Sequence, residues 1–281
     1  MPANIINGKA LADKIRDKLK EKISKGNAKP GLAIIQVGDN PVSAVYINKK
    51  MLAGNDVGIN MQHVKLPENC RNEDVLQKID ELNNSPEIHG MIVQLPLPKQ
   101  LDTNLVMNAV LPHKDVDGFH PVNIGNLAAG SPKFIPATAK GILKLIESTG
   151  IPLKGRHAVV VGRSNIVGRP TSYLLLQKDC TVTVCHRETR DLASHTRQAD
   201  ILVVAVGKIG LITGSMIKPG AIVIDVGMNK TEDGRLCGDV DFNTAKDFAG
   251  WITTVPGGVG PMTVAMLLEN TYEAMVNNPF K

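Results

Sequence analysis

Two patterns of apolar residues alternate along the chain. Short apolar runs rich in valine and isoleucine are typical of strands in a parallel sheet. They occupy residues 32–37, 61–66, 90–95, 157–162, 181–185, 201–206, 221–226 and 251–255. Apolar residues three and four apart predict helices over 8–24, from Asn40-Pro41 onward, from Asn72 onward, and over 103–110, 141–148, 171–177, 191–198 and 262–276. This alternation predicts an α/β protein with a mainly parallel sheet.

The segment 113–126 interrupts the alternation, because it contains turn residues and shows no clear period. We interpret it as an ordered loop that leads into a link between two domains. The first domain is expected over residues 1–120, with the C-terminal helix, 262–281, packed back onto it. The second, over 139–261, is expected to be doubly wound like dinucleotide-binding domains, with a cleft between the two.

Composition excludes several classes of protein. The apolar runs are far shorter than a membrane span and the N-terminus lacks a signal-peptide core, so we expect a cytoplasmic protein without membrane contact. Four cysteines without a C-x-x-C pair predict no disulfide framework, and no Cys/His cluster indicates a metal site. A net charge of +5 with 3% aromatic residues disfavours nucleic-acid binding and suits a pocket for anionic small molecules.

The segment His157–Pro170, HAVVVGRSNIVGRP, has the order of a phosphate-binding turn. A valine-rich strand ends at Gly162, and Pro170 is tolerated only in the first turn of a helix. Glycines permit close approach of the backbone, and the free N–H groups of a helix start favour an anion. Ser164 occupies the place of the second glycine in G-x-G-x-x-G, so the motif alone is a weak signal.

The end of the next strand indicates which dinucleotide such a turn would bind. NAD-binding folds usually place Asp or Glu there, to hold the ribose 2′-hydroxyl. This chain has Cys185-His186-Arg187 instead, and Arg163 lies within the turn. Two arginines without a carboxylate favour a 2′-phosphate, and therefore NADP, over two ordinary surface arginines.

The first domain contains candidates for proton transfer and substrate binding. Tyr46 and Lys50 lie four apart on one helix, although this pair alone is better explained by a tyrosine at the core edge and a solvated lysine. Gln94 ends an apolar strand, where a buried amide needs a polar partner or a ligand. Asp115 and Asp117 can bind a heterocycle or merely cap a turn.

Glycines are unusually dense in the segment 256–261, PGGVGP. An ordinary turn seldom needs three glycines in four positions. The density therefore indicates that this backbone closely approaches a ligand or another strand.

Together these segments resemble one family, the bifunctional methylenetetrahydrofolate dehydrogenase/cyclohydrolases. The resemblance is carried, in family order, by GDNPVSAVYINKK (38–50), VQLPLP (93–98), KDVDGFHP (114–121), GRSNIVGRP (162–170) and PGGVGPMTVA (256–265). It implies a homodimer joined through its nucleotide domains. It also implies two reactions of one-carbon metabolism: NADP⁺ oxidises 5,10-methylenetetrahydrofolate to the methenyl form, which is then hydrolysed to 10-formyltetrahydrofolate.

The resemblance also implies roles for individual residues. Lys50 would be the general acid/base, Gln94 its hydrogen-bonding partner, Tyr46 a stacking platform and Asp117 the anchor of the pterin. In addition, Gly258 and Pro261 would lie against the folate. The residues that would hold NADP are Gly162, Arg163, Ser164, Ile166 and Arg187.

The segment 136–141, PATAKG, departs from the family pattern P-C-T-P, and we expect Thr138 to keep its role in a turn. Two alternatives stay open on the residues alone. One is another two-domain dehydrogenase of the shikimate type, which an acidic residue at Arg187 would have favoured. The other is a regulatory module that binds a dinucleotide without catalysis; the set Tyr46, Lys50, Gln94 and Asp117 disfavours it.

Overall fold

The computed structural model describes residues 2–277, which divide into two compact units. The chain up to Ala12 and Thr138–Thr263 form a six-stranded unit; Asp13–Ala137 and the chain from Val264 onward form a three-stranded unit. The strand Asn4–Ile6 belongs to the six-stranded unit, because it pairs with the strand Trp251–Thr253. Within the described residues, no helix is both long and apolar enough to cross a bilayer.

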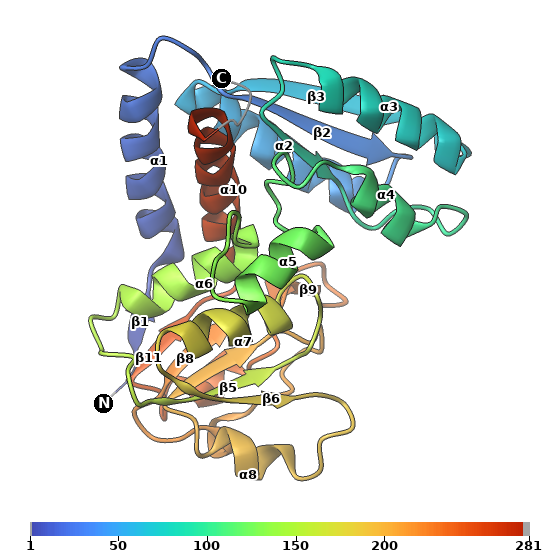
Figure 1. The fold of residues 1–281 in the computed structure, drawn as a ribbon. Helices are drawn as coiled ribbons and strands as arrows, with labels where there is room; N and C mark the ends of the chain where they lie inside the picture. Colours follow the sequence, from blue (N-terminus) through green and yellow to red (C-terminus); the bar gives the residue numbers. More distant parts are fainter. Residues whose placement is uncertain (1, 278–281) are drawn as a thin grey trace. The chain divides into compact units, whose positions relative to one another are not determined.

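All strands of the six-stranded sheet run parallel, in the order β1-β11-β8-β7-β5-β6 (Figure 1). These strands are β1 (Asn4–Ile6), β5 (His157–Val161), β6 (Thr181–Cys185), β7 (Ile201–Val204), β8 (Ile222–Asp225) and β11 (Trp251–Thr253). The chain runs from β5 to β6 on one side and then to β7 on the other. Such a reversal creates a crevice at the carboxyl ends of β5 and β7, where doubly wound folds bind ligands.

Helices cover both faces of this sheet, as the doubly wound pattern predicts. Figure 1 shows α6 and α7 on one face and α8 on the other. The helical segments are α6 (Ala137–Glu147), α7 (Gly168–Gln177), α8 (Leu192–Thr196), η1 (Gly214–Met216) and α9 (Phe242–Ala245), and β9 (Asn229–Lys230) forms a hairpin with β10 (Leu236–Cys237). On one face, alternate residues of β5 and β7 pack against Ile212, Ile217 and Ala245.

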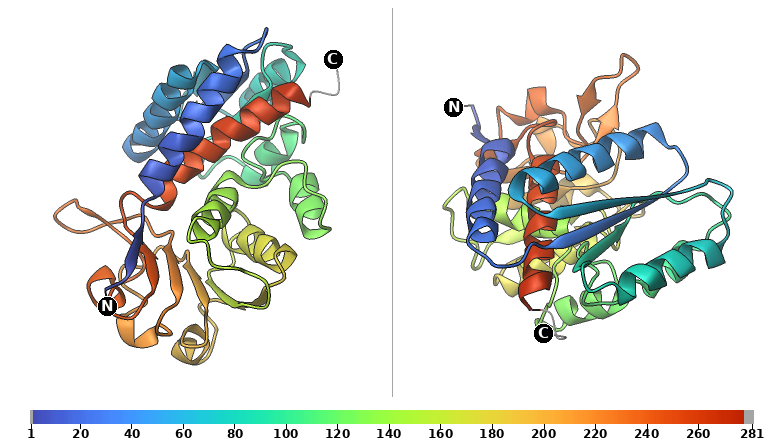
Figure 2. Two further views of the ribbon diagram at one scale, coloured as in Figure 1. Left: turned by 90° about the vertical axis from the view of Figure 1, so that its left-hand side faces the viewer. Right: turned by 90° about the horizontal axis from the view of Figure 1, so that it is seen from above.

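The three-stranded sheet is also parallel, with β2 (Gly31–Val37) between β3 (Asn60–Leu66) and β4 (Gly90–Val93). Every residue of β2 is buried, which fits a run whose one polar residue is Gln36. Figure 2 shows α2 (Pro41–Val57) and α3 (Asn72–Asn84) on opposite sides of this sheet. The remaining helices are α1 (Gly8–Ser24), α4 (Thr103–Ala109), α5 (Pro121–Ala128) and α10 (Val259–Val276).

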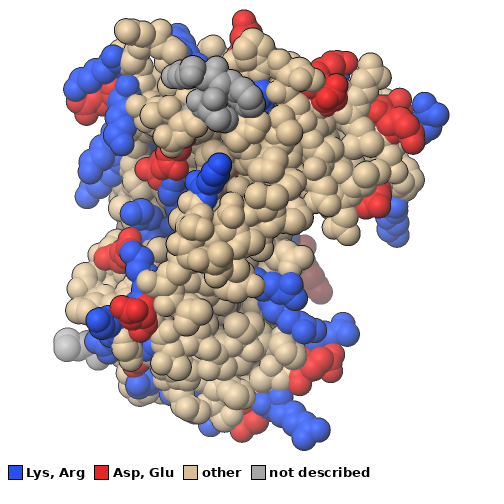
Figure 3. Space-filling model, in the orientation of Figure 1, with Lys and Arg blue, Asp and Glu red and all other residues tan. Residues whose placement is uncertain are grey.

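Helix α1 has the amphipathic pattern that its sequence predicts. Leu19 and Ile23 are buried, whereas the lysines of the helix are exposed and line the left edge of Figure 3. Helix α10 begins at Val259, so the last three residues of the segment 256–261 belong to its first turn. The end of the predicted helix, 278–281, lies outside the described residues.

Helices α2 and α3 both begin where the sequence predicts, but their asparagines have different roles. Asn40 caps α2, because its Oδ1 accepts a hydrogen bond from the N–H of Ser43 at 3.1 Å. Asn72 does not cap α3; Arg71 holds that position, and Asn72 Oδ1 accepts instead from the N–H of Asp102 at 3.0 Å. The loop predicted over 113–126 is wrong in its second half, where α5 begins at Pro121.

Candidate active site

The candidate proton-transfer group lies in the middle of α2. Lys50 follows Tyr46 by four residues, so the two side chains share one helix face, and both are half-buried. Burial raises the pKa of the Tyr46 phenol, and its ring stays uncharged at neutral pH. The pair therefore presents an aromatic surface and an amine side by side.

Gln94 connects this helix to the sheet. It directly follows β4 at the carboxyl edge, where its backbone N–H bonds to the carbonyl of Ile35 at 2.9 Å. Its Oε1 accepts a hydrogen bond from Lys50 Nζ at 3.0 Å, and its Nε2 donates to the carbonyl of Leu95 at 2.8 Å. Because both ends of the amide are bonded, the side chain holds Lys50 Nζ in one place.

Burial changes the ionisation of Lys50 and Asp117 together. It lowers the pKa of Lys50, because the ammonium loses hydration, and the carboxylate of Asp117 opposes that shift. Burial likewise raises the pKa of Asp117; Lys50 opposes this shift, and Asp115 adds to it. The neutral amine of Lys50 therefore forms at a lower pH than in an exposed lysine, as proton transfer near neutral pH requires.

The two aspartates of the 114–121 segment have different tasks. Asp115 is buried and caps the turn: Oδ1 accepts from the N–H of Gly118 at 3.1 Å, and Oδ2 accepts from the N–H of His120 and from Asn123 Nδ2, both at 2.8 Å. Asp117 lies on this capped turn close enough to Lys50 for each charge to shift the other's pKa. Turn-capping therefore explains Asp115, and Asp117 stays available for a ligand.

Asn270, on α10, fixes the same turn from the far end of the chain. It is fully buried, and its Nδ2 donates to the carbonyls of Val116 at 2.9 Å and Ile135 at 3.0 Å. The apolar pattern predicted a helix over 262–276 but did not single out this residue. A lone asparagine in an apolar helix is nevertheless a usable signal, since a buried amide needs partners.

In the six-stranded unit, the turn after β5 has the close contacts that its glycines indicated. Gly162 has a φ of +124°, and a Cβ on it would lie 2.3 Å from the carbonyl oxygen of Ala205. A Cβ on Gly168 would lie 2.1 Å from the carbonyl oxygen of Gly162. Ser164 shapes the turn through its hydroxyl, which accepts from the N–H groups of Val167 and Gly168 at 3.2 and 3.4 Å.

The residues expected to hold NADP gather at the carboxyl ends of two neighbouring strands. Gly162, Arg163, Ser164 and Ile166 follow β5, and Arg187 follows β6, which pairs with β5 up to Val161 and Cys185. All of these except Gly162 are exposed. Arg187 Nε bonds only an exposed neighbour, Glu188 Oε1, at 2.7 Å, a weak surface pair. The glycine turn and two exposed arginines fit a phosphorylated dinucleotide.

Gly258 and Pro261 belong to the six-stranded unit, whereas Lys50, Gln94 and Asp117 belong to the three-stranded one. The glycine-rich turn approaches other parts of the chain closely. A Cβ on Gly258 would lie 2.8 Å from Thr253 Cβ, and one on Gly8 would lie 2.0 Å from the carbonyl oxygen of Gly258. Thr138 lies in the first turn of α6, where its Oγ1 accepts from Thr263 Oγ1 at 3.2 Å.

Two family models match the chain in sequence order. Residues 6–117 match the catalytic domain of tetrahydrofolate dehydrogenase/cyclohydrolase, and residues 136–278 match the NAD(P)-binding domain of the same family. A curated relative, the bifunctional protein FolD of Cupriavidus taiwanensis, is 52% identical over 277 residues, which cover 98% of each chain.

Solved structures give the same result. The bifunctional enzyme FolD of Campylobacter jejuni aligns with a TM-score of 0.96 and 45% identity, over 98% of this chain and 99% of its own. A FolD of Trypanosoma brucei, complexed with NADP cofactor and inhibitor, aligns with 0.94 and 38% over 98% of both chains. A shikimate 5-dehydrogenase of Thermus thermophilus, at 0.52 and 16%, shares the fold alone. The chain belongs to the tetrahydrofolate dehydrogenase/cyclohydrolase family.

Proposed function

We propose that this chain oxidises 5,10-methylenetetrahydrofolate to 5,10-methenyltetrahydrofolate with NADP⁺ and hydrolyses the product to 10-formyltetrahydrofolate. The single observation that carries the proposal is the hydrogen bond of 3.0 Å from Lys50 Nζ to Gln94 Oε1, beside Asp117. It supports the hydrolytic step in particular. Adding water and opening the methenyl ring require proton transfers, and Lys50 is the group whose pKa burial lowers toward the working range.

Each residue of the cluster has a separate role. Lys50 takes a proton from the attacking water and returns one to the leaving ring nitrogen. Gln94 orients the lysine amine, because its own Nε2 is hydrogen-bonded to the carbonyl of Leu95 and its side chain is therefore fixed. The carboxylate of Asp117 accepts hydrogen bonds from the N–H groups of the pterin. Tyr46 stacks on the aminobenzoyl ring. Gly258 and Pro261 lie against the folate.

The oxidative step depends on positioning. NADP⁺, when bound, supplies a nicotinamide that accepts a hydride. The chain has to position the methylene carbon of the substrate against the nicotinamide, and this step needs no acid or base. Gly162, Ser164 and Ile166 form the turn that meets the dinucleotide, and Arg163 and Arg187 bind the 2′-phosphate, for which guanidinium groups are well suited.

We also propose that the chain works in the cytoplasm as a homodimer joined through its nucleotide-binding units. Cys70, Cys180, Cys185 and Cys237 are free, which suits a reducing compartment. Strand β6 lies at the edge of the six-stranded sheet, with Val184 39% exposed and Leu176 of α7 60% exposed. An unpaired edge with apolar side chains favours pairing with a second copy.

Sedimentation tests the dimer. The wild type should sediment at twice the mass of one chain, and Val184→Lys should sediment as a single chain, because a lysine at the edge opposes pairing. A variant that keeps the dimer mass, or a wild type of single-chain mass, contradicts this interface.

Substitution of the lysine tests the hydrolytic role. Lys50→Met should reduce hydrolysis of methenyltetrahydrofolate to its spontaneous rate, because the proton-transfer group is lost while the aliphatic stem stays. Folate binding, measured by calorimetry, should stay within about threefold, because Tyr46 and Asp117 still bind the aromatic ring and the pterin. Lys49→Met, at the exposed neighbouring position, is the control and should behave as the wild type. Enzymatic hydrolysis by Lys50→Met above the spontaneous rate would rule out the assignment.

Cofactor preference is tested at Arg187. Arg187→Ser should weaken NADP⁺ binding by about tenfold or more, the effect of losing one charge-assisted bond to phosphate. NAD⁺ binding should change little, because that cofactor has no 2′-phosphate. Arg156→Ser, an exposed arginine just before β5 at the amino edge of the sheet, is the matched control. Equal losses for both cofactors, or faster wild-type turnover with NAD⁺, would contradict the phosphate assignment.

A further inference from the structure

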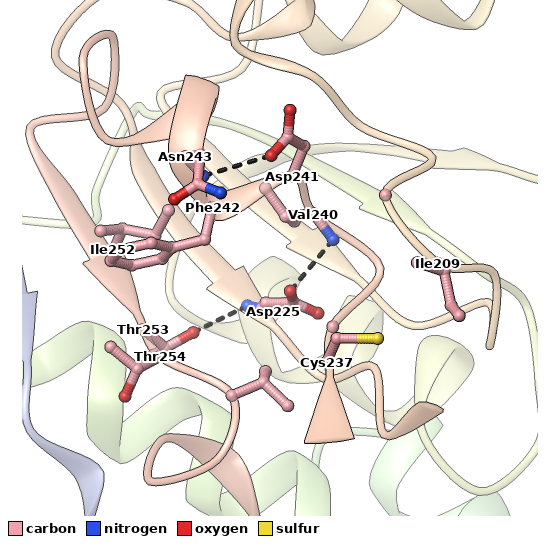
Figure 4. A pocket seen from close by; sticks show the side chains of 13 residues that line it. Ile209, Asp225, Cys237, Val240, Asp241, Phe242, Asn243, Ile252, Thr253 and Thr254 are labelled. Carbon is pink, nitrogen blue, oxygen red and sulfur yellow. Dashed lines mark hydrogen bonds between the residues drawn. The ribbon is translucent and has the colours of Figure 1, made fainter. Parts of the chain in front are cut away.

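Two buried carboxylates lie under the carboxyl ends of β7 and β8, and neither the sequence motifs nor the roles proposed above use them. Asp239 is completely buried and Asp225 is 4% exposed. Asp225 forms part of the wall of a cavity of about 660 Å³ (Figure 4). Its carboxylate accepts backbone N–H groups from Gly227 and Asp239 at 2.9 Å and from Val240 at 3.0 Å.

Asp239 binds the loop that follows β7. Its Oδ2 accepts from the N–H groups of Val206 and Gly207 at 2.7 and 3.0 Å, and its Oδ1 accepts from the N–H of Lys208 at 2.8 Å. Asn229 Nδ2 donates to the same Oδ1 at 2.9 Å. One carboxylate thus takes three successive backbone N–H groups and one side-chain amide, a complete set for its lone pairs.

The neighbouring glycines leave room for this arrangement. A Cβ on Gly238 would lie 1.7 Å from Asp225 Oδ2, and a Cβ on Gly227 would lie 2.5 Å from Asp239 Oδ1. The two carboxylates are therefore enclosed by backbone that approaches them as closely as glycine allows. This close packing fixes the loop 205–208 relative to β8.

The orientation of the loop follows from these bonds. In a trans peptide the carbonyl points away from the N–H of the next residue. The N–H groups of Val206, Gly207 and Lys208 point toward Asp239. The carbonyl of the residue before each of them, in 205–207, therefore points away from Asp239. The Ala205 carbonyl lies against Gly162 of the turn after β5, so the carbonyls of Val206 and Gly207 are the ones that face outward. Residues 206–208 are themselves exposed.

The loop 205–208 lies at the reversal of strand order between β5 and β7, the place where doubly wound folds bind a dinucleotide. An outward row of carbonyl oxygens accepts hydrogen bonds and does not bind phosphate. Its chemical complement is a neutral donor: the ribose hydroxyls or the carboxamide NH₂ of a nicotinamide riboside. The phosphates are then left to the turn 162–168.

We propose that Asp239 is a positioning residue for the dinucleotide: its carboxylate turns the N–H groups of loop 205–208 inward, so that the loop's carbonyls receive the nicotinamide riboside half of NADP⁺. This inference rests on the proposed function, because it takes NADP⁺ as the cofactor. It assigns the two halves of the cofactor to different loops. It also predicts that a change at Asp239 affects one half only.

The test is Asp239→Asn, which replaces one acceptor oxygen by an NH₂ that faces N–H donors. Calorimetry should show NADP⁺ binding weakened by about tenfold, the equivalent of one or two hydrogen bonds. Binding of 2′,5′-ADP, which lacks the nicotinamide riboside, should be unchanged, and so should hydrolysis of methenyltetrahydrofolate. Measurements at pH 8 keep Asp225 ionised, because burial raises its pKa to about 6.

Two further variants keep the test decisive. Asp200→Asn is the matched control: Asp200 accepts a backbone N–H from His157 at 2.9 Å at the opposite edge of the sheet, and NADP⁺ binding should not change. Asn229→Ala removes one bond to Asp239 and should weaken NADP⁺ binding by about threefold, again without effect on 2′,5′-ADP. Asn229→Ala decides the question should Asp239→Asn not fold.

Two results would overturn the inference. One is unchanged NADP⁺ binding in folded Asp239→Asn, or in Asn229→Ala if Asp239→Asn does not fold. The other is an equal loss of affinity for NADP⁺ and for 2′,5′-ADP in the same variant, because a role in folding alone would affect both halves of the cofactor. A 3-acetylpyridine analogue of NADP⁺, which lacks the carboxamide NH₂, separates the two donors. If Asp239→Asn weakens binding of the analogue less than binding of NADP⁺, the contact is to the carboxamide; if it weakens both equally, the contact is to the ribose.

Failure of the proposed function gives a different result, because the wild type would then bind no NADP⁺.

Discussion

The burial of one lysine amine beside one carboxylate is the constraint on which the three-stranded unit depends. Removing both groups from water is unfavourable for each charge. The chain must therefore hold the two groups close together and supply hydrogen bonds to their remaining donors and acceptors. Gln94 fixes the amine from the edge of the sheet. Asp115 and Asn270 fix the turn that carries Asp117 through bonds to backbone N–H and carbonyl groups. Residues of α2 and α10, the residue after β4 and the turn at 115–118 thus serve one proton-transfer site.

In the six-stranded unit, polar side chains also fix the backbone of loops, but these loops are the ones expected to bind a dinucleotide. A dinucleotide must meet loops from several parallel strands, and such loops have backbone groups that a sheet does not pair. Ser164 and Asp239 each take consecutive N–H groups of one loop. Of these two acceptors, Ser164 is exposed on its own turn and Asp239 is buried. Under our proposal, the buried carboxylate of Asp239 sets which side of loop 205–208 faces the cofactor without touching it.

Most of the fold follows from the apolar patterns, because parallel strands buried on both faces form nearly continuous apolar runs such as 31–37. Strand β1 could not be predicted, since three residues gain their stability only by pairing with β11, almost the whole chain away. Proline at 121 starts α5 within a stretch of turn residues, where no period reveals a helix. Lys50, Gln94 and Asp117 were accessible through their motifs. The different tasks of Asp115 and Asp117 were not, because both are aspartates in one loop, and only their hydrogen bonds and neighbours in the folded chain distinguish them.

The most direct test of the account is the pKa of Lys50. NMR of protein with ¹³C-labelled lysine, in which Lys50→Met identifies the Lys50 signal, follows the titration of this one amine. We expect its pKa below the ordinary lysine range, because burial outweighs the attraction of Asp117. Asp117→Asn should lower it further, since the opposing carboxylate charge is removed. A Lys50 pKa at or above that of exposed lysines would contradict the assignment of Lys50 as the proton-transfer group.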